Sequence, residues 1–368
     1  MKPDLAEIVK HFRFEGDFLE VNLCKLGHIN DTYIVRFRKA DGAAHRYILQ
    51  RINHNVFKSP EELMHNIAEV TTHLRRKIIA AGGNPERETL SLIPTVGEGT
   101  FYRTPDGNYW RAYAFIEGAQ TYEVVENLDH VYNASKAFGK FQRLLSDFPA
   151  GQLYETIPNF HHTRKRFGAF VEAVERDVKN RAQSVKAEIE FVEKRAEDTS
   201  VLVDLLERGE LPERVTHNDT KFNNVMIDDE TGEGVCIVDL DTVMPGSSLY
   251  DFGDSVRSGA NPAAEDEQDL SKVCIDLEIF DRFARGYLDA ARDFLTPTEV
   301  DYMPFSAKLM TLECGMRFLA DHLNGDVYFR IHRENHNLDR CRTQFKMVED
   351  MEAKFDQMVR IVGKYRYV

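Results

Sequence analysis

Cysteines are few in this sequence, and they are widely spaced. The 368 residues include five, at positions 24, 236, 274, 314 and 341, and no CxxC pair occurs. Disulfide frameworks and zinc sites use closely spaced or regularly patterned cysteines, so neither is indicated. Cys236 and Cys314 lie in apolar stretches, which favours buried thiols. This usage fits a protein of the reducing cytoplasm.

Positive charge is scarce as well. The chain has 47 Lys and Arg residues against 61 Asp and Glu residues, which gives a formal net charge of -14. A surface that binds the phosphate backbone of nucleic acid needs clustered Lys and Arg, so nucleic acid is not expected as a partner. A nucleotide site would need local positive charge to offset the acidic field around it.

Long apolar segments are missing too. No stretch approaches the ~20 uninterrupted apolar residues of a transmembrane helix, so no membrane partner is expected. Residues 1–14 alternate charged and apolar side chains and contain no apolar core of the kind found in signal peptides. No internal repeat, low-complexity segment or obligate protein partner is evident. These absences predict a globular cytoplasmic protein.

The sequence does contain enough apolar residues for a sizeable core. At 42% hydrophobic content, the chain is long enough for a two-lobed globular protein. In its first part, Ser59-Pro60-Glu61-Glu62 predicts the start of a helix with an apolar face from residue 63 to residue 78. Alternating patterns predict strands at residues 19–26, 31–38, 45–52, 101–103 and 109–116.

One short segment carries the strongest chemical signal. It is His217-Asn218-Asp219-Thr220-Lys221-Phe222-Asn223-Asn224, hereafter the catalytic loop. A kinase loop of this kind places an Asp at the acceptor hydroxyl, a Lys two residues later at the γ-phosphate and an Asn five residues after the Asp at Mg²⁺. Asp219, Lys221 and Asn224 have this spacing. Each piece alone is a common accident, but together they predict phosphoryl transfer.

A β-hairpin is predicted directly after the loop. Strand patterns at residues 224–227 and 235–240 flank a stretch rich in Asp, Glu, Thr and Gly. With the turn at the centre of that stretch, Asn224 and Asp239 become cross-strand neighbours. Two side-chain oxygens then meet, which suits Mg²⁺, a hard cation that completes its shell with water and phosphate oxygens. Asn224 and Asp239 are therefore the predicted metal ligands.

The remaining chain is predominantly helical in pattern. Amphipathic periodicity dominates from residue 122 onward, and the pattern changes at Glu117-Gly118. We therefore expect an α+β, bilobal, protein-kinase-like fold. Residues 1–117 would form a small β-rich lobe that binds nucleotide, and residues 118–368 a larger α-helical lobe with the catalytic and acceptor sites. ATP would bind in the cleft between the lobes.

These motifs resemble the aminoglycoside phosphotransferase and choline kinase superfamily and, more closely, its bacterial N-acetylhexosamine 1-kinase family. The resemblance extends over nearly the whole chain, which makes it more specific than the catalytic loop alone. Its runs are GHIN (27–30), YILQ (47–50), RVTHNDTKFNN (214–224), DLDTVMPGS (239–247), DFGDS (251–255), ECGMRFLAD (313–321) and GDVYF (325–329).

The resemblance implies a kinase that uses ATP and Mg²⁺ to phosphorylate the anomeric C1 hydroxyl of N-acetylglucosamine and N-acetylgalactosamine. In that role Asp219 would accept or orient the hydroxyl proton. Asp251 would brace the catalytic loop. The sequence does not fix a preference between the two epimers. The positions that match residues around the sugar are His28, Asn30, Arg317 and Tyr328.

Arg317 has two interpretations. It lies one helical turn from Glu313 and from Asp321, so spacing alone favours ordinary intrahelical ion pairs on a solvent face. The resemblance instead places its guanidinium group at the sugar, where it would donate to an acetamido carbonyl or to ring hydroxyls.

The expected nucleotide contacts depart from the usual kinase pattern. Kinases place a Lys in the third strand to hold the α- and β-phosphates, whereas YILQ has Gln50 there. Either Gln50 donates neutral hydrogen bonds, or a neighbouring base such as Arg46 or Arg51 turns inward. The residues expected at the adenine are Phe115, Ile116 and Glu117.

Two other functions stay open. The first is a kinase of another small hydroxylated molecule, such as a different sugar, an aminoglycoside or choline. The last two are cations, whose sites use carboxylates or aromatic boxes, and Arg317 would repel them. The second is a nucleotide-binding pseudokinase that regulates a partner, against which the complete set of Asp219, Lys221, Asn224 and Asp239 argues.

Overall fold

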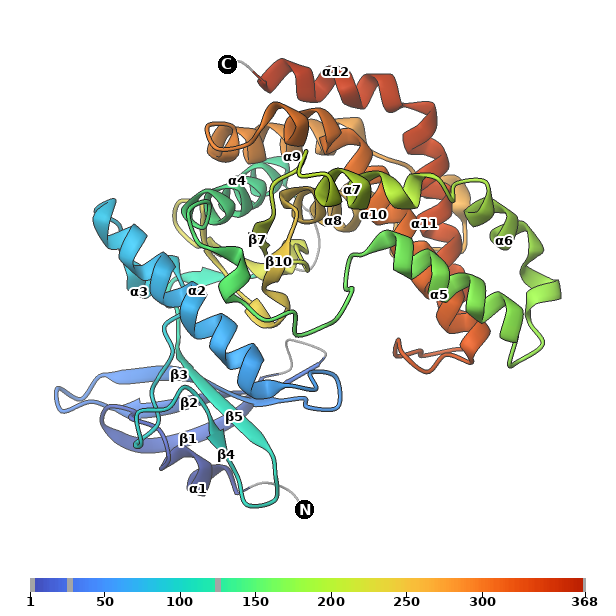
Figure 1. The fold of residues 1–368 in the computed structure, drawn as a ribbon. Coiled ribbons are helices and arrows are strands. Elements are labelled where there is room, and N and C mark those ends of the chain that lie inside the picture. The colour runs from blue at the N-terminus through green and yellow to red at the C-terminus, as the bar shows by residue number, and fades with distance from the viewer. Residues whose placement is uncertain (1–3, 25–28, 123–126, 367–368) are drawn as a thin grey trace. The chain divides into compact units, whose positions relative to one another are not determined.

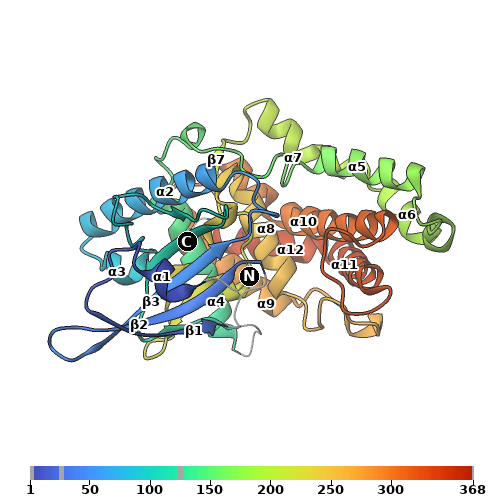
Figure 2. The same cartoon turned by 90° about the horizontal axis from the view of Figure 1, so that it is seen from below.

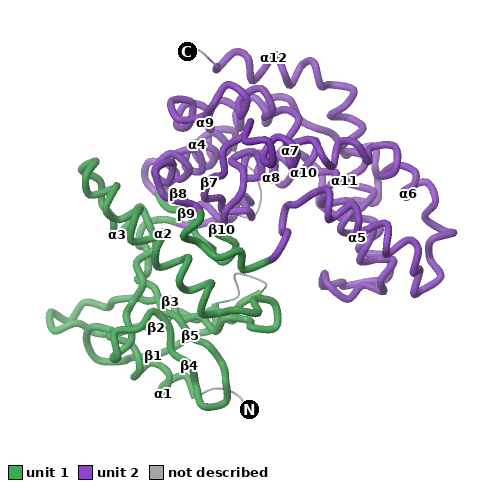
Figure 3. Tube along the Cα trace, viewed as in Figure 1, with its two compact units in different colours: residues 1–119, 151–157, 235–244 green, residues 120–150, 158–234, 245–368 purple. Residues whose placement is uncertain are grey.

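The chain folds into two compact units in the computed structural model, which describes residues 4–24, 29–122 and 127–366. The first unit comprises residues 1–119, 151–157 and 235–244, and the second comprises residues 120–150, 158–234 and 245–368 (Figure 3). The first unit thus joins the N-terminal part to two short pieces from much later in the sequence. The assignment of nucleotide binding to residues 1–117 and of catalysis to residues 118–368 stays a prediction.

An antiparallel sheet forms the centre of the first unit (Figure 1). The strand order is β1-β2-β3-β5-β4, and every pair of neighbours is antiparallel. The predicted strands are confirmed, with described bounds that differ by no more than two residues, and residues 25 and 26 of the first predicted strand lie outside the described residues. These strands are β1 (Asp17–Cys24), β2 (Asp31–Arg38), β3 (Ala44–Ile52), β4 (Tyr102–Arg103) and β5 (Tyr109–Ala114).

Helices cover both faces of this sheet (Figures 1 and 2). Helix α1 (Leu5–Val9) packs on the face that carries Val35, Leu49 and Trp110. Helix α2 (Pro60–Ala80) lies on the other face, where its Met64 contacts Arg111 of β5. Pro60 starts α2 as predicted, but the side chain of Ser59 makes no capping hydrogen bond. A short helix, α3 (Pro85–Glu88), follows.

The second unit is mostly helical. Its longest helix, α10 (Pro297–Asn324), begins with a capping box of Thr296 and Glu299 and ends at Gly325, which has φ 97°. The other helices are α4 (Leu128–Leu144), α5 (Thr163–Arg176), α6 (Lys186–Glu193), α7 (Asp198–Glu207), α8 (Ser248–Gly259), α9 (Leu277–Ala291), α11 (His336–Ala353) and α12 (Phe355–Tyr365).

Helices α4 and α9 pack closely because each presents a glycine to the other. A Cβ atom on Gly139 of α4 would lie 2.6 Å from the carbonyl oxygen of Tyr287 on α9. A Cβ atom on Gly286 of α9 would clash with the carbonyl oxygen of Tyr132 on α4. Larger residues at these two positions would push the helices apart.

In the described parts of the chain, no helix combines the length and the apolar character needed to cross a membrane. All five cysteines carry free thiols, and Cys236 and Cys341 are buried. Burial also raises the pKa of Cys314 to about 11.

Candidate active site

The catalytic loop lies between two short strands, β7 (Arg214–Thr216) and β8 (Val225–Asp228). Lys221 Nζ is 2.8 Å from Asp219 Oδ1. Asn224 Nδ2 donates to the main-chain oxygen of Asp219 at 2.8 Å and to its Oδ2 at 3.2 Å. The structure therefore brings together the three residues whose spacing indicates phosphoryl transfer. Their roles in a reaction stay predictions.

Two carboxylates of α8 hold the backbone of this loop. The buried Asp251 accepts from the main-chain N–H groups of His217 at 2.9 Å and Asn218 at 2.8 Å. Asp254 accepts from the main-chain N–H of Thr220 at 2.9 Å. Because these bonds use only backbone donors of the loop, they fix its path and leave its side chains available for chemistry. The bracing position expected for Asp251 is confirmed.

The charges around the loop are balanced in pairs. Burial alone would raise the pKa of Asp254, but Arg257, with its Nε 2.7 Å from Asp254 Oδ1, holds that pKa below its ordinary value. Burial raises the pKa of Asp251. The Lys221 side chain is 48% exposed, and the adjacent Asp219 carboxylate raises the pKa of Lys221. Lys221 therefore keeps the positive charge that a phosphate contact needs.

The predicted hairpin after the loop is present, but its second strand is shorter than predicted. The main-chain N–H of Asp228 donates to the carbonyl oxygen of Glu233 at 2.9 Å, between β8 and β9 (Gly234–Ile237). The second strand ends at Ile237, so the predicted strand to residue 240 is wrong. The reason is local, because Asp239 has φ 59° and ψ 56°, a left-handed conformation that cannot continue a strand.

Neither predicted metal ligand lies in a strand. Asn224 ends a short 3₁₀ helix (Phe222–Asn224) in the second unit, and Asp239 precedes another (Leu240–Thr242) in the first. The inference that they are partners in a regular hairpin ladder is therefore wrong. Their oxygens still suit a hard cation, and a shared metal site stays a prediction.

A buried arginine that the sequence analysis missed holds the segment after Asp239. Arg111 of β5 is 1% exposed, and its guanidinium group forms an ion pair with Asp241. Asn30 Nδ2 also donates to Asp241 Oδ2, at 2.6 Å. Burial opposes the charge of Arg111, but Asp241 outweighs it and raises the arginine pKa. The available signal was a lone charge among aromatic residues and alanines in residues 109–114.

Gln50 belongs to the same buried network. The strand register places it opposite Thr32 on β2 and Arg111 on β5. Gln50 Nε2 donates to Thr32 Oγ1 at 3.0 Å, and Gln50 Oε1 accepts from Arg111 Nε at 3.0 Å. Both ends of its amide group therefore have partners within the sheet. A contact between Gln50 and nucleotide phosphates stays a prediction.

The two arginines considered for the phosphates are half-buried, and each pairs with an acid. Arg46 forms an ion pair with Glu117, and its guanidinium carbon lies 3.8 Å from the centroid of the Phe115 ring. Arg51 forms an ion pair with Asp31. Arg46 thereby orders two of the three residues predicted at the adenine, the third being Ile116.

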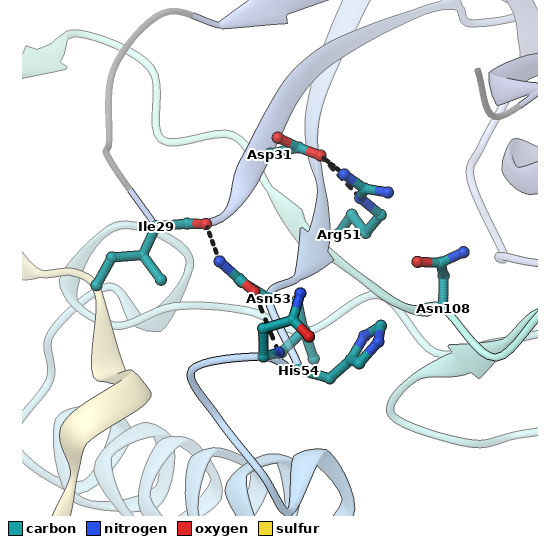
Figure 4. A pocket seen from close by; sticks show the side chains of 8 residues that line it. Ile29, Asp31, Arg51, Asn53, His54 and Asn108 are labelled. Atoms are coloured by element: carbon teal, nitrogen blue, oxygen red, sulfur yellow. Dashed lines mark hydrogen bonds and ion pairs between the residues drawn. The ribbon is translucent and has the colours of Figure 1, made fainter. Parts of the chain in front are cut away.

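A polar pocket of about 190 Å³ opens in the first unit near Asn30 (Figure 4). Asn30 Oδ1 accepts from the main-chain N–H of Asn53 at 3.0 Å, and Asn53 Nδ2 donates to the carbonyl oxygen of Ile29 at 3.2 Å. Asn30 is thus held at both ends of its amide group. The other predicted sugar residue of this segment, His28, lies outside the described residues. The residues labelled in Figure 4 are Ile29, Asp31, Arg51, Asn53, His54 and Asn108.

Arg317 and Tyr328 are brought together in the second unit. The guanidinium carbon of Arg317, on α10, lies 5.9 Å from the centroid of the Tyr328 ring. It also lies 5.1 Å from the ring of Phe160 and 5.6 Å from that of Phe329. The Arg317 side chain is only 16% exposed, so the alternative of a residue on an open solvent face is wrong. Phe160 is a neighbour that the sequence analysis did not identify.

The predicted helical partners of Arg317 have other contacts. Glu313 Oε1 lies 3.9 Å from Arg317 Nη1, which makes a long ion pair. The same oxygen is hydrogen-bonded to His161 Nδ1. Asp321 Oδ1 accepts from the main-chain N–H of Tyr328 at 2.8 Å, and Asp321 Oδ2 accepts from that of Phe329 at 2.9 Å. Asp321 therefore positions the segment that carries Tyr328.

Comparisons with known proteins agree with this arrangement. The sequence model of the phosphotransferase enzyme family matches residues 20–296. An aminoglycoside phosphotransferase from Alicyclobacillus acidocaldarius superposes with a TM-score of 0.62 at 12% identity, covering 99% of this chain and 97% of its own.

Two kinases give similar superpositions. A microcompartment-associated aminopropanol kinase has a TM-score of 0.58 at 13% identity, with 96% of this chain and 97% of its own covered. An amicoumacin kinase in complex with AMP-PNP and Ca²⁺ has a TM-score of 0.58 at 11% identity, with 95% and 92% covered. Together with the antiparallel sheet and the helical second unit, these likenesses confirm the predicted α+β, kinase-like fold class.

Proposed function

This chain belongs to the phosphotransferase enzyme family, and from that premise we propose that it is an ATP- and magnesium-dependent kinase of N-acetylhexosamines. The reaction transfers the γ-phosphoryl group of ATP to the anomeric C1 hydroxyl of N-acetylglucosamine or N-acetylgalactosamine. The observation that carries the proposal is the joint presence, in one unit, of the Asp219–Lys221–Asn224 cluster and of a shielded Arg317 beside Tyr328.

Asp219 acts chiefly by positioning the acceptor. In a loose phosphoryl-transfer transition state the attacking hydroxyl needs little activation, so alignment with the phosphorus and late acceptance of the proton are sufficient. Lys221, 2.8 Å from Asp219, supplies positive charge next to the carboxylate that meets the hydroxyl. This charge stabilises the negative charge on the transferring group.

Asn224 and Asp239 are the residues we propose as metal ligands. Asn224 turns its Nδ2 atom to Asp219, which leaves its Oδ1 atom as the ligand. An amide oxygen and a carboxylate form a donor set that fits Mg²⁺. When bound, the ion would neutralise phosphate charge and orient the nucleotide.

The surroundings of Arg317 favour an uncharged acceptor with a carbonyl group. Three rings enclose the guanidinium group, and its five N–H donors in a fixed fork suit an acetamido oxygen or ring hydroxyls. Arg166 lies nearby, and burial together with the charge of Arg317 lowers the pKa of Arg166. Two cations in one region would repel aminoglycosides, aminopropanol or choline.

A substrate panel tests this function. Purified protein is incubated with ATP, Mg²⁺ and each of several sugars, amino alcohols and aminoglycosides, while ADP release and reducing sugar are measured. We expect ADP release only when an N-acetylhexosamine is present, with loss of its reducing end, because phosphorylation at C1 blocks that end. A product that keeps its reducing end would place the phosphate on another hydroxyl. ADP release with a cationic acceptor would refute the sugar assignment. No acceptor-dependent turnover would favour a pseudokinase.

A further inference from the structure

A buried histidine connects the catalytic loop to helix α10. His161, in the segment before α5, is 7% exposed. Its Nδ1 atom lies 2.8 Å from Glu313 Oε1 on α10, and its Nε2 atom lies 3.0 Å from the main-chain oxygen of Asn218 in the loop. The three residues come from distant parts of the sequence, and all lie in the second unit.

Both contacts of His161 are with atoms that accept hydrogen bonds. The carbonyl oxygen of Asn218 can only accept, so Nε2 must carry a hydrogen. The close approach of Nδ1 to a carboxyl oxygen requires a second hydrogen between those two atoms. The imidazole ring is therefore a two-ended link, and shortening it at either end breaks one of the two bonds.

The link acts on the peptide group directly before Asp219. The oxygen of that peptide group accepts from His161, and its N–H donates to His217 Nδ1 at 3.3 Å. The preceding residue, Asn218, has φ 66°, a left-handed conformation that only a few residue types tolerate. Two histidine rings thus hold the peptide plane from which the Asp219 side chain projects, so this plane sets the direction of the carboxylate.

Glu313 connects this link to Arg317. Its Oε1 atom is shared between His161 at 2.8 Å and Arg317 Nη1 at 3.9 Å. The Glu313 residue is 1% exposed, and its Oε2 atom has no hydrogen-bond partner among the described residues. Phe160, whose ring borders Arg317, is the chain neighbour of His161. A movement of the guanidinium group therefore changes the charge that competes with His161 for Glu313.

We infer that His161 and Glu313 are positioning residues that transmit acceptor binding at Arg317 to Asp219. This inference rests on the proposed function. An acceptor carbonyl that binds Arg317 draws the guanidinium group away from Glu313, which then binds His161 more strongly and fixes the loop. An acceptor without that carbonyl leaves the carboxylate shared and the loop less fixed. Selection between acceptors is then expressed in kcat more than in KM.

Two substitutions of His161 separate the ends of the link. In His161→Asn the amide nitrogen takes the place of Nδ1, so the Glu313 bond is kept and the Asn218 bond is lost. In His161→Gln the amide nitrogen takes the place of Nε2, so the reverse holds. Because misplacement of a reacting group by about 1 Å costs about 100-fold in rate, we expect kcat of His161→Asn to fall by roughly 10- to 100-fold. The KM for ATP should change little.

His161→Gln should affect selectivity more than rate. With the loop bond kept, kcat for N-acetylglucosamine should fall only about 3-fold, while the ratio of kcat for N-acetylated over non-acetylated hexoses should collapse toward one. Glu313→Gln, which keeps the shape of the side chain and removes its charge, should reduce that ratio in the same way. The control is His162→Gln, at the adjacent histidine outside this link, which should behave as wild type.

The outcomes separate this inference from the proposed function. If the wild-type enzyme prefers another acceptor, the sugar assignment fails, and His161→Asn is then measured with that acceptor. The melting temperature shows whether the His161→Asn protein is folded. A folded His161→Asn protein with wild-type kcat would overturn the link for any acceptor. Unchanged acceptor ratios in both His161→Gln and Glu313→Gln would overturn transmission from Arg317. If His161→Asn fails to fold, the ratio of kcat for N-acetylated over non-acetylated hexoses in Glu313→Gln still tests the inference.

Discussion

The two units hold their predicted functional segments in different ways. In the first unit, the segment after Asp239 is held by a buried ion pair between Arg111 and Asp241. In the second unit, the catalytic loop is held by carboxylates, chiefly that of Asp251, which accept hydrogen bonds from the backbone N–H groups of the loop. The first arrangement uses two opposite side-chain charges, and the second uses acidic groups and the peptide backbone.

This difference has a physical consequence. A buried ion pair is costly to break on one side only, because the remaining charge has neither water nor partner. A carboxylate that accepts from the backbone loses one or two hydrogen bonds when it is neutralised, which costs less. The bonds to Asp251 and Asp254 also use only backbone donors of the loop. We therefore expect removal of a single charge to lower the unfolding free energy most in the first unit. In the second unit we expect substitutions to lower turnover most.

The largest expected effect is on turnover in the second unit. Asp219→Asn removes the carboxylate that positions the acceptor and takes its proton, so kcat should fall by about 10² to 10⁴-fold. Affinity for an ATP analogue should change little. A coupled ADP-release assay and a binding titration measure the two quantities. The matched control is Glu230→Gln, an exposed acid on the turn after β8. Near-normal turnover in Asp219→Asn would remove the basis of the proposed mechanism.

The next largest effect is on the stability of the first unit. Arg111→Met leaves the buried Asp241 carboxylate with its Asn30 hydrogen bond but without its ion-pair partner, so the free energy of unfolding should fall by about 3–5 kcal/mol. The double variant Arg111→Met/Asp241→Leu should recover most of this loss. The only tryptophan, Trp110, is buried next to Arg111, so its fluorescence during urea denaturation reports on this unit. Equal destabilisation of the single and double variants would show that packing, and not the unpaired charge, is responsible.

A smaller loss is expected for the backbone clamp of the second unit. Asp251→Asn keeps one acceptor oxygen but places an amide N–H group against a backbone N–H, so the unfolding free energy should fall by about 1–3 kcal/mol. Far-UV circular dichroism, which follows the helical unit, measures this change. Turnover should fall in parallel because the loop loses its fixed path. A variant that kept full activity would argue against the clamp as a determinant of loop geometry.

The smallest effect is expected away from the site. Thr296→Ala removes one side of the capping box of α10, which should cost about 1 kcal/mol of stability. Turnover should be unchanged, since the cap is at the far end of α10 from Arg317. Circular dichroism measures the stability, and the ADP-release assay measures the turnover. A fall in kcat at this position would show that the activity of the second unit follows its overall stability.

The clustering of Asp219, Lys221 and Asn224 could be predicted from the sequence because it depends on spacing within one eight-residue segment. The strands of the first unit were predictable for a similar reason, since alternation of apolar residues is a local pattern. The second strand of the hairpin was predicted too long, because no local sequence pattern indicated the left-handed conformation of Asp239. Arg111 was missed because its partner, Asp241, lies 130 positions along the chain.

The sequence by itself determined the fold class and the residue types of the candidate site, since both follow from local periodicity and fixed spacing. Only the tertiary structure decided which charges meet. It buried Arg111 against Asp241, enclosed Arg317 in three aromatic rings and placed His161 between Glu313 and Asn218. Such contacts join segments far apart in the chain, and their strength depends on burial, which no local pattern specifies.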